Sequence, residues 1–407
     1  MARYIAIPRK RPAKPDPDSS AVGYSVKKRA NRIASLRSSR LRNRELQLSE
    51  SLVAKYELSS TRKLLATPQR QTPLTGVTII EGDAQDAEEL QNELPDHEVI
   101  EDFDLFLVEP TPEAGPPPQE DNLDLWHLGA IALDKARNSG FQGVGQGIGV
   151  AVLDTGIAQV DELDGRIKDA FELDVNMKPV KIDTHDTHGH GTGVAALIAG
   201  KTVGVAPGVD LYNFITIPNR RGSYSNFVLA TEFIAGQSGV AIANISAGVR
   251  GWDPRIMPGI EALLEAYILP VVAVGNEGSE TSRSPGNYSN VLSVGATNKR
   301  GRIWSGSGSE EIHKVPPPYQ VPNLVGPGAR VTTCNGDGVF RVYNGSSLAT
   351  PIVSGIAALI LEQYEDITDT ELREAIFGAC LKLEHAEAER QGNGQVQLPS
   401  DMWFTGV

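Results

Sequence analysis

The chain has 407 residues, 40% of them apolar, and a formal net charge of −13, which indicates a large folded protein of two or three domains. Two cysteines, Cys334 and Cys380, exclude a disulfide scaffold, and we expect both to be reduced. The sequence contains no run of about 18 apolar residues and no signal pattern after Met1, so we expect no membrane span and a cytoplasmic location.

Residues 1–50 form a basic segment in an otherwise acidic chain. They hold 13 Lys and Arg against four Asp and Glu, which puts +9 on this segment and −22 on residues 51–407. Few apolar residues are available to offset the cost of ordering it, so we expect a flexible arm. A tether to an anionic surface is the functional alternative, and no specific nucleic-acid partner is predicted. Asp16, Asp18 and several prolines weaken a transit-peptide interpretation.

Residues 51–110 have the composition of a small α+β module. Its periodicity predicts a helix over Ala84–Leu94 and strands over Val77–Ile80, Glu98–Ile100 and Asp104–Val108. The continuous apolar run of the last strand predicts that both of its faces are covered. Five prolines among residues 110–119 then predict a stiff, extended linker over residues 111–119.

Residues 120–407 alternate short apolar runs with helical patterns. The runs predict buried strands at residues 147–153, Val209–Ile217, Val240–Ser246, Leu269–Gly275 and Val291–Gly295. Helices are predicted near Val194–Ala199, Asn226–Ala235, Pro258–Tyr267 and Leu348–Ile360. This alternation indicates an α/β fold with a doubly wound, mostly parallel sheet. Sites in such sheets form beyond the carboxyl ends of the strands.

Four polar residues stand at predicted ends of these elements. Asp154 ends the first strand, His190 opens a helix between glycines, Asn276 follows a buried strand, and Ser347 opens the last long helix. Taken alone, Ser347 is explained by an ordinary helix N-cap. Pro351, four residues into the helical pattern, is a poor choice for helix stability and favours another reason for this motif.

Together the four residues suit nucleophilic attack on an amide. A serine hydroxyl needs a base to remove its proton, and an imidazole base needs a carboxylate that fixes its tautomer. A side-chain amide can donate to the oxyanion that forms, together with a backbone N–H near the serine. The sequence therefore predicts that Asp154, His190, Asn276 and Ser347 converge.

Four motifs carry a resemblance to a known family. Residues 154–156 (Asp-Thr-Gly), 190–192 (His-Gly-Thr), 275–278 (Gly-Asn-Glu-Gly) and 345–351 (Gly-Ser-Ser-Leu-Ala-Thr-Pro) resemble the signature blocks of the subtilisin-like serine peptidases, in that family's order. The resemblance runs from about Trp126 to Leu398. It implies a subtilisin-type fold and a serine endopeptidase in which Asp154 orients, His190 acts as base and Ser347 is the nucleophile. It also implies that Asn276 binds the oxyanion.

The resemblance also implies a substrate-binding groove. Residues 244–248 are similar to the family's edge strand, which pairs with an extended peptide, and residues 322–328 are similar to its loop before the final strands. The residues implied to contact a protein or peptide substrate are Ser246, Ala247, Gly248, Ala273, Val274, Gly275 and Glu277. We interpret Glu277 as a carboxylate near the rim of the specificity pocket that favours a basic or polar residue there.

The sequence departs from the family pattern at two residues near the catalytic motifs and in one loop that binds calcium in many relatives. Ser346 replaces the usual Thr and Gly193 a common second His, and neither change removes a catalytic group. The loop after the His190 helix lacks the insertion that forms a strong calcium site in many relatives, so we expect no required cofactor and doubt calcium there. A zinc cluster of His185, His188 and His190 is a weak alternative, because no further ligand pattern joins them.

Residues 51–110 resemble, weakly, the propeptide of these peptidases, with an unrelated accessory domain as the equal alternative. A propeptide would assist folding and inhibit the enzyme, and we expect its cleavage near Glu120–Leu123. Two other functions stay open, namely a maturation protease for one intracellular partner and a peptide-binding pseudoenzyme. The sequence does not predict an oligomeric state.

Overall fold

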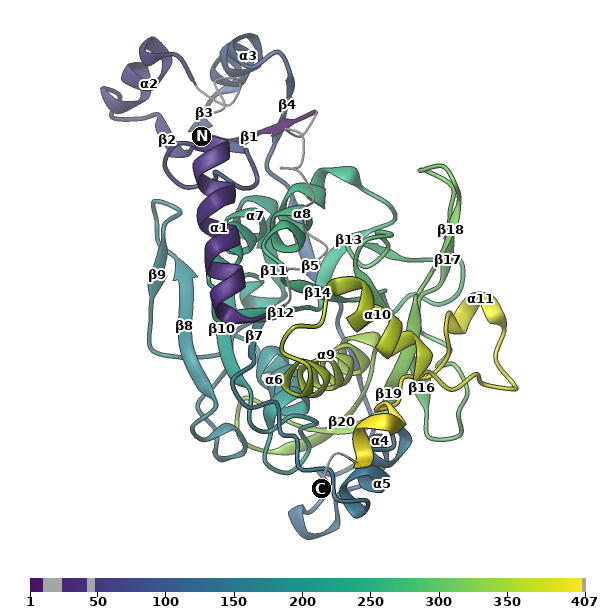
Figure 1. Cartoon of the computed structure of the whole chain (residues 1–407). Coiled ribbons are helices and arrows are strands. Elements are labelled where there is room, and N and C mark those ends of the chain that lie inside the picture. The colour runs from purple at the N-terminus through teal and green to yellow at the C-terminus, as the bar shows by residue number, and fades with distance from the viewer. Residues whose placement is uncertain (10–23, 42–47, 405–407) are drawn as a thin grey trace.

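The protein is described by a computed structural model that covers residues 1–9, 24–41 and 48–404. Figure 1 shows a small N-terminal module beside a larger body, with one long helix, α1 (Val26–Leu41), running from the module along that body. The module contains strands β1 (Ala2–Pro8), β2 (Lys63–Ala66), β3 (Thr78–Gly82) and β4 (His97–Glu101), with helices α2 (Glu50–Glu57) and α3 (Ala84–Glu93).

The N-terminal module is a four-stranded sheet in the order β2-β3-β1-β4. Strand β1 pairs antiparallel with both β3 and β4, so the first residues of the chain supply an inner strand of this sheet. The helices cover one face, where Leu90 of α3 packs with Ala6 and Ile80. A capping box between Asp83 and Asp86 starts α3 at the predicted place.

The structure differs from the expected flexible arm over residues 1–50. Residues 2–8 are strand β1 and residues 26–41 are helix α1, whereas residues 10–23 and 42–47 of this segment lie outside the described residues. Arg29 on α1 is only 2% exposed, and its guanidinium donates to the Ser238 carbonyl at 3.0 and 2.8 Å. Composition alone predicts that the Arg29 charge is solvated, whereas in the structure the Ser238 carbonyl of the body takes the place of water around it.

The chain leaves the module and runs through the body as two strands. Strand β5 (Asp104–Leu107) lies between β11 (Arg221–Ser223) and β13 (Ala247–Arg250) in a second, antiparallel sheet. Its burial alternates, and Phe106 is 47% exposed, so the expectation that both faces are covered was wrong. Strand β6 (Thr111–Pro112) pairs with β20 (Phe340–Asn344), which fixes the start of the predicted linker to the large sheet.

A ten-stranded sheet forms the centre of the body within the described residues. Its spatial order is β6, β20, β19 (Leu324–Cys334), β16 (Leu292–Asn298), β14 (Leu269–Ala273), β12 (Val240–Ile245), β7 (Gly149–Asp154), β10 (Asp210–Ile215), β8 (Ile167–Leu173), β9 (Pro179–Lys181). The strands from β19 to β8 pair in parallel, and the outer pairs are antiparallel. The mostly parallel, doubly wound α/β fold is therefore confirmed.

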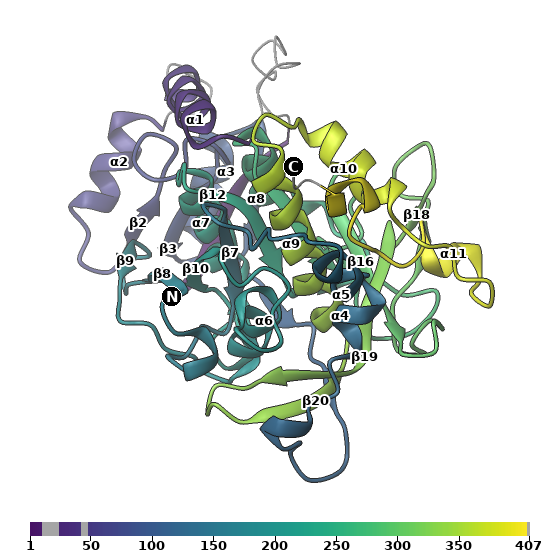
Figure 2. The ribbon, with the colours of Figure 1, turned by 60° about the horizontal axis from the view of Figure 1, so that its bottom comes forward.

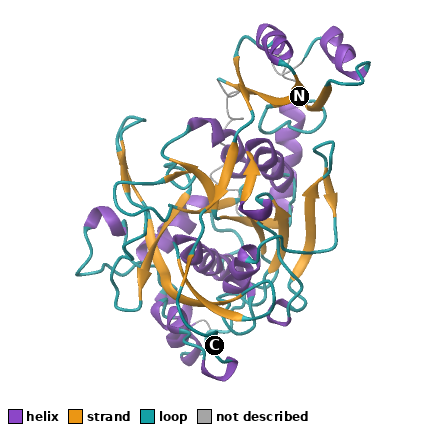
Figure 3. Cartoon of the chain, turned by 180° about the vertical axis from the view of Figure 1, so that it is seen from behind, coloured by secondary structure: helices purple, strands orange, loops and turns teal. Residues whose placement is uncertain are grey.

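Helices cover both faces of this sheet, as Figures 2 and 3 show. Val150 and Val152 of β7 pack on the side of α6 (His190–Ala199) and α9 (Ser346–Gln363). The alternate residues Ala151 and Leu153 pack on the side of α7 (Tyr224–Ala235) and α8 (Met257–Glu265). Because successive strand side chains point to opposite faces, a continuous apolar run in β7 fills both layers.

The periphery carries shorter elements. These are α4 (Trp126–Ala130), α5 (Leu133–Asn138), α10 (Asp369–Gly378), α11 (Ala388–Gln391), the 3-10 turn η2 (Glu120–Asn122), and strands β15 (Arg283–Ser284), β17 (Glu310–Ile312) and β18 (Tyr319–Val321). Helix α9 is long and apolar enough, by length and composition, to cross a membrane, but its most apolar window is 89% buried inside the body. It thus acts here as a core helix, and Cys334 and Cys380 are free thiols.

Candidate active site

The four predicted residues come from four elements of the central layer. Asp154 is the last residue of β7, and Asn276 follows β14 by three residues, so they stand at and just beyond the carboxyl ends of parallel strands. His190 is the first residue of α6, and Ser347 is the second residue of α9. Asp154 and Ser347 have no exposed surface and His190 is 7% exposed, so they share a desolvated environment.

Asp154 and His190 are joined directly. The Nδ1–H of His190 donates to Oδ1 of Asp154 at 2.7 Å, and the backbone N–H of Thr155 donates to the same oxygen at 2.7 Å. Burial disfavours the charged imidazole, but the charge and hydrogen bond of Asp154 outweigh burial and raise the pKa of His190 above its usual value. The carboxylate thereby fixes the tautomer that leaves Nε2 unprotonated and able to accept a proton.

The reactive atoms of this site have no hydrogen-bond partner within the described parts of the chain. They are Nε2 of His190 and Oγ of Ser347, and both atoms are buried. Buried polar atoms are normally paired, so unpaired ones call for an explanation. A serine hydroxyl and an imidazole nitrogen that both await a partner are suited to a substrate that completes the site.

Asp186 holds the loop that carries His190, and sequence reasoning missed it. Its carboxylate accepts from the backbone N–H groups of His188, Gly189 and Thr192 and from the hydroxyls of Thr155 and Thr192. These bonds connect the end of β7 to the start of α6. A lone aspartate in a loop rich in Thr and His gives no sequence signal for this role.

Asn276 is oriented by Ser346, the residue before the candidate nucleophile. The backbone N–H and the hydroxyl of Ser346 both donate to Oδ1 of Asn276, at 2.8 and 2.9 Å. This fixes the amide so that Nδ2 faces the site, where it donates to the carbonyl of Glu109 at 2.9 Å and approaches that of Val108 at 3.5 Å. Asn276 therefore presents a donor to a backbone carbonyl, as an oxyanion site requires.

At two positions in the site, neighbouring atoms leave no room for a Cβ, so that only glycine fits without displacing them. A Cβ on Gly345 would stand 2.9 Å from Oγ of Ser347, 3.1 Å from Nδ2 of Asn276 and 3.1 Å from Cβ of Pro110. A Cβ on Gly191 would stand 2.1 Å from the carbonyl oxygen of Gly156, so α6 can approach β7 only with glycine there. The glycine-rich motifs are thus explained by close approach of backbone and side chains.

The chain's own residues 104–110 lie across this site. Leu107 pairs with Ala247 and Phe106 with Gly248, and the N–H of Val108 donates to the carbonyl of Ser246 at 2.8 Å. The chain then passes Asn276, and Pro110 lines a hollow together with His190 and Leu348. An extended peptide therefore occupies the groove that the sequence assigned to substrate.

The other predicted substrate-binding residues lie in different surroundings. Ala273 and Val274 are buried at the end of β14. The N–H of Gly275 donates to the hydroxyl oxygen of Ser346 at 3.3 Å, and the Gly275 carbonyl oxygen lies 3.0 Å from the same hydroxyl oxygen. Glu277 is held by Arg283, whose Nε donates to it at 2.9 Å. Burial alone would raise the pKa of Glu277, but the hydrogen bonds and charge of Arg283 lower it below its usual value. Because this carboxylate is already paired, it gives no support to the predicted preference for basic residues.

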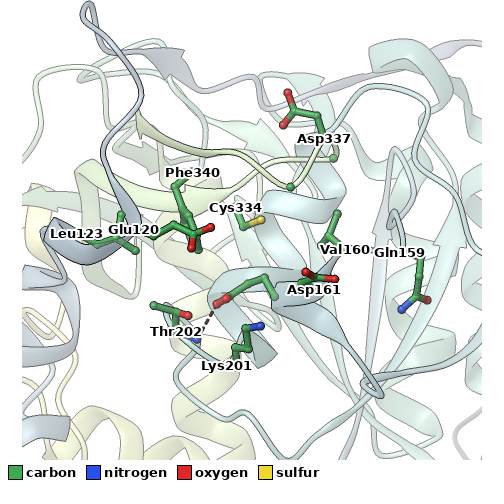
Figure 4. A pocket seen from close by; sticks show the side chains of 13 residues that line it. Glu120, Leu123, Gln159, Val160, Asp161, Lys201, Thr202, Cys334, Asp337 and Phe340 are labelled. Carbon is green, nitrogen blue, oxygen red and sulfur yellow. Dashed lines mark hydrogen bonds between the residues drawn. The ribbon is translucent and has the colours of Figure 1, made fainter.

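A separate hollow of about 590 Å³ is lined in part by Cys334 and residues 336–338 and is drawn in Figure 4. Oε1 of the buried Glu162 accepts the N–H groups of Thr202 and Val203 there, at 2.7 and 3.0 Å, whereas its Oε2 has no partner among the described residues. The N–H groups of the short loop thus occupy Oε1 of Glu162. The Lys201 cation lines the same hollow together with the carboxylates of Glu120, Asp161 and Asp337.

Comparisons with known proteins identify the family of this chain. The profile of the subtilase family matches residues 145–394. Subtilisin BL from Lederbergia lenta is 30% identical over 268 residues, which cover 63% of this chain and 91% of that protein. A thermostable alkaline protease from Halalkalibacterium halodurans is 32% identical over 278 residues, which cover 67% of this chain and 71% of that protein.

Solved structures extend the likeness of the fold to the N-terminal module. Fervidolysin from Fervidobacterium pennivorans aligns with a TM-score of 0.67 at 16% identity and covers 100% of this chain and 61% of its own. The epidermin leader peptide processing serine protease of Staphylococcus aureus aligns with a TM-score of 0.68 at 17% identity, covering 87% and 96%.

The family match covers more than half of the chain, so the chain belongs to the subtilase family. It is a subtilisin-like serine endopeptidase, and its substrates are proteins or peptides.

Proposed function

We propose that the protein cuts peptide bonds through an acyl-enzyme formed on Ser347. His190 Nε2 takes the proton from the Ser347 hydroxyl while Oγ bonds to the substrate carbonyl carbon. The oxyanion is held by Nδ2 of Asn276 and by the backbone N–H of Ser347 at the start of α9, where the helix dipole favours negative charge. The single observation that carries this mechanism is the 2.7 Å bond from His190 to Asp154 beside two unpaired reactive atoms.

Collapse of this intermediate breaks the C–N bond. The leaving amine takes the proton from His190, and the acyl group remains on Oγ of Ser347. A water molecule then gives its proton to Nε2, attacks the ester carbonyl and releases the acid, and the proton returns to Ser347. Asp154 stabilises the imidazolium in both halves and stays a carboxylate.

The N-terminal module is proposed to act as an intramolecular inhibitor that the enzyme later cuts. Three contacts support this role. Strand β5 fills the groove between β11 and β13, Nδ2 of Asn276 donates to the Glu109 carbonyl of the segment, and β6 pairs with β20 beyond the site. Leu105, Leu107 and Val108 are buried in this position. Their burial and the strand pairing favour the inhibited state.

The first cut is proposed within Val108–Pro110 and not in the Glu120–Leu123 stretch that the sequence suggested. The carbonyls of Val108 and Glu109 are those that face Asn276, whereas Glu120 and Leu123 line the separate hollow of Figure 4. The bond before Pro110 is a tertiary amide, which favours the Val108–Glu109 bond as the one attacked.

Intact-mass measurement of the full chain over time tests this proposal. We expect the wild type to be cut between residues 108 and 110 and the Ser347→Ala variant to stay whole. A fully active protein that remains uncut would contradict the inhibitor role. Cutting of Ser347→Ala at the same bond, with no other protease present, would contradict the nucleophile assignment. A wild type that stays uncut and cuts no peptide would favour the pseudoenzyme alternative.

A further inference from the structure

Acidic residues of the segment that crosses the active site are matched by arginines of the body. The segment runs from residue 104 to residue 113, on both sides of the catalytic serine. Among the described residues, three ion pairs join Asp104 to Arg221, Glu109 to Arg220 at 2.9 Å, and Glu113 to Arg330 at 2.5 Å. Pairing between acidic residues of the segment and arginines of the body therefore extends along the groove from residue 104 to residue 113.

The groove carries more positive charge than the segment uses. A hollow of about 900 Å³ beside Asn276 is lined by Arg220, Arg221, Arg250 and Arg283, and Glu277 is the acidic residue of the body in its lining. Glu277 is bound by Arg283 and lies 3.6 Å from Arg250, whose side chain is 77% exposed. Residues 51–407 carry a net charge of −22, so a cationic groove is a local feature opposed to the overall charge.

Between its acidic residues, the segment carries a short apolar run that packs into the groove. Leu105, Leu107 and Val108 are buried against the groove, whereas Phe106 points outward and is 47% exposed. A bound peptide thus places apolar side chains in the floor of the groove, while acidic residues at both ends of the apolar run meet arginines at its rim.

We propose that the groove selects peptides in which acidic residues flank a short apolar run. By the register of residues 104–113, one acid stands four residues before the residue in the Val108 position, one directly after it and one five residues after it. This inference rests on the proposed function, because the same groove must first be cleared of the N-terminal segment. It names the class of substrate that the cleared groove takes.

The charges involved are partly exposed, which limits the effect of each pair. The Arg220, Arg221 and Arg330 side chains are 54%, 67% and 69% exposed. Exposed pairs contribute little singly, roughly two- to fivefold each, so three together should change kcat/KM by about ten- to hundredfold. The preference should weaken at high salt, because ions screen exposed charges.

Three fluorogenic peptides test the inference on the full-length protein after it has processed itself. The first copies residues 104–113 with alanine in place of both prolines. The second replaces its three acids by the matching amides, and the third replaces them by lysine. Active enzyme is counted in each preparation with a fluorophosphonate probe, so that differences in release of the N-terminal segment do not enter the rates.

We expect the acidic peptide to be cut about ten- to hundredfold faster than the amide peptide, and the lysine peptide slowest. The triple variant Arg220→Gln, Arg221→Gln and Arg330→Gln should bring the acidic and amide peptides to within about threefold of each other. Arg300→Gln is the matched control, since it removes an exposed arginine on the turn after β16, outside the groove, and should leave the ratio unchanged.

The outcomes separate this inference from the function on which it rests. A probe-reactive enzyme that cuts the acidic and amide peptides equally would overturn the acidic preference and leave the peptidase function standing. A folded protein that neither reacts with the probe nor cuts any of the three peptides would contradict the peptidase function itself. A preference that persists in the triple variant would show that other residues cause it.

Discussion

Asn276→Ala removes one defined hydrogen-bond donor from the site, and its effect can be worked out from the structure. The amide Nδ2 donates to a backbone carbonyl at 2.9 Å, and Oδ1 is held by the N–H and hydroxyl of Ser346. Loss of one oxyanion donor lowers kcat by about 10²–10³, a value known from subtilisin itself. Because the donor acts mainly on the transition state, KM should change little.

Ser346→Ala provides the matched comparison. This variant keeps the amide of Asn276 but removes the hydroxyl that is one of the two donors orienting it. A single neutral hydrogen bond is worth about 1 kcal/mol, so we expect a loss in kcat of roughly fivefold. Asn276→Ala should also lower the free energy of unfolding by about 1–3 kcal/mol, because the N–H of Ser346 loses its acceptor.

Steady-state hydrolysis of one peptide, normalised to active enzyme, measures both variants, and thermal unfolding shows that each is folded. The order of effects is the informative result. If kcat of a folded Asn276→Ala protein stayed within about twofold of the wild type, Asn276 would not bind the oxyanion. An equal loss in both variants would instead indicate a structural role for the Asn276–Ser346 pair.

Three further outcomes follow from the site and from the contact between the two parts of the chain. The Asp154→Asn variant should lose about 10⁴ in kcat and, in a pH profile of kcat/KM, shift the acid limb to lower pH, because burial then opposes protonation of His190 without a compensating carboxylate. Gly345→Ala should lower kcat/KM about 100-fold with little change in Tm, since its Cβ would stand 2.9 Å from Oγ of Ser347. Glu232 of α7 joins the body to the N-terminal module, because its carboxylate accepts the backbone N–H groups of Leu74 and Thr75. Burial outweighs these bonds and raises the pKa of Glu232 from 4.5 to about 7, so the folded protein keeps a proton that the unfolded chain releases in that range. The free energy of unfolding should therefore fall as pH rises from about 4.5 to 7, and its dependence on pH should be weaker for Glu232→Gln.

The sequence predicted the central sheet and placed Asp154, His190, Asn276 and Ser347 at ends of its elements, because these signals are local. Asp154 and Asn276 follow apolar runs, His190 and Ser347 precede apolar helical patterns, and each has a glycine within two residues, which marks an element boundary. The predicted helix over Ala84–Leu94 likewise agrees with α3 within one residue, because Asp83 and Asp86 form a local capping box. Periodicity and capping are properties of neighbouring residues, so they can be read without the fold.

The features that were not predicted depend on contacts between distant parts of the chain. Arg29 is buried because it meets the carbonyl of Ser238, 209 residues away, and composition gives no sign of that acceptor. Strand β1 gains its place from partners near residues 78–82 and 97–101. Arg220 and Arg221 pair with Glu109 and Asp104, more than 100 residues earlier in the chain, and the sequence analysis predicted neither contact.

The position of a covalent fluorophosphonate adduct tests the assignment of the nucleophile most directly. We expect mass spectrometry of the processed protein to find one adduct, on Ser347, and we expect labelling to be lost in Ser347→Ala and strongly slowed in His190→Ala. The Ser347 hydroxyl is buried and has no hydrogen-bond partner among the described residues, and Asp154 orients the imidazole proposed as its base, which is why this serine should react and others should not. An adduct on a different serine, or a folded and processed protein that never reacts, would contradict the catalytic role of Ser347.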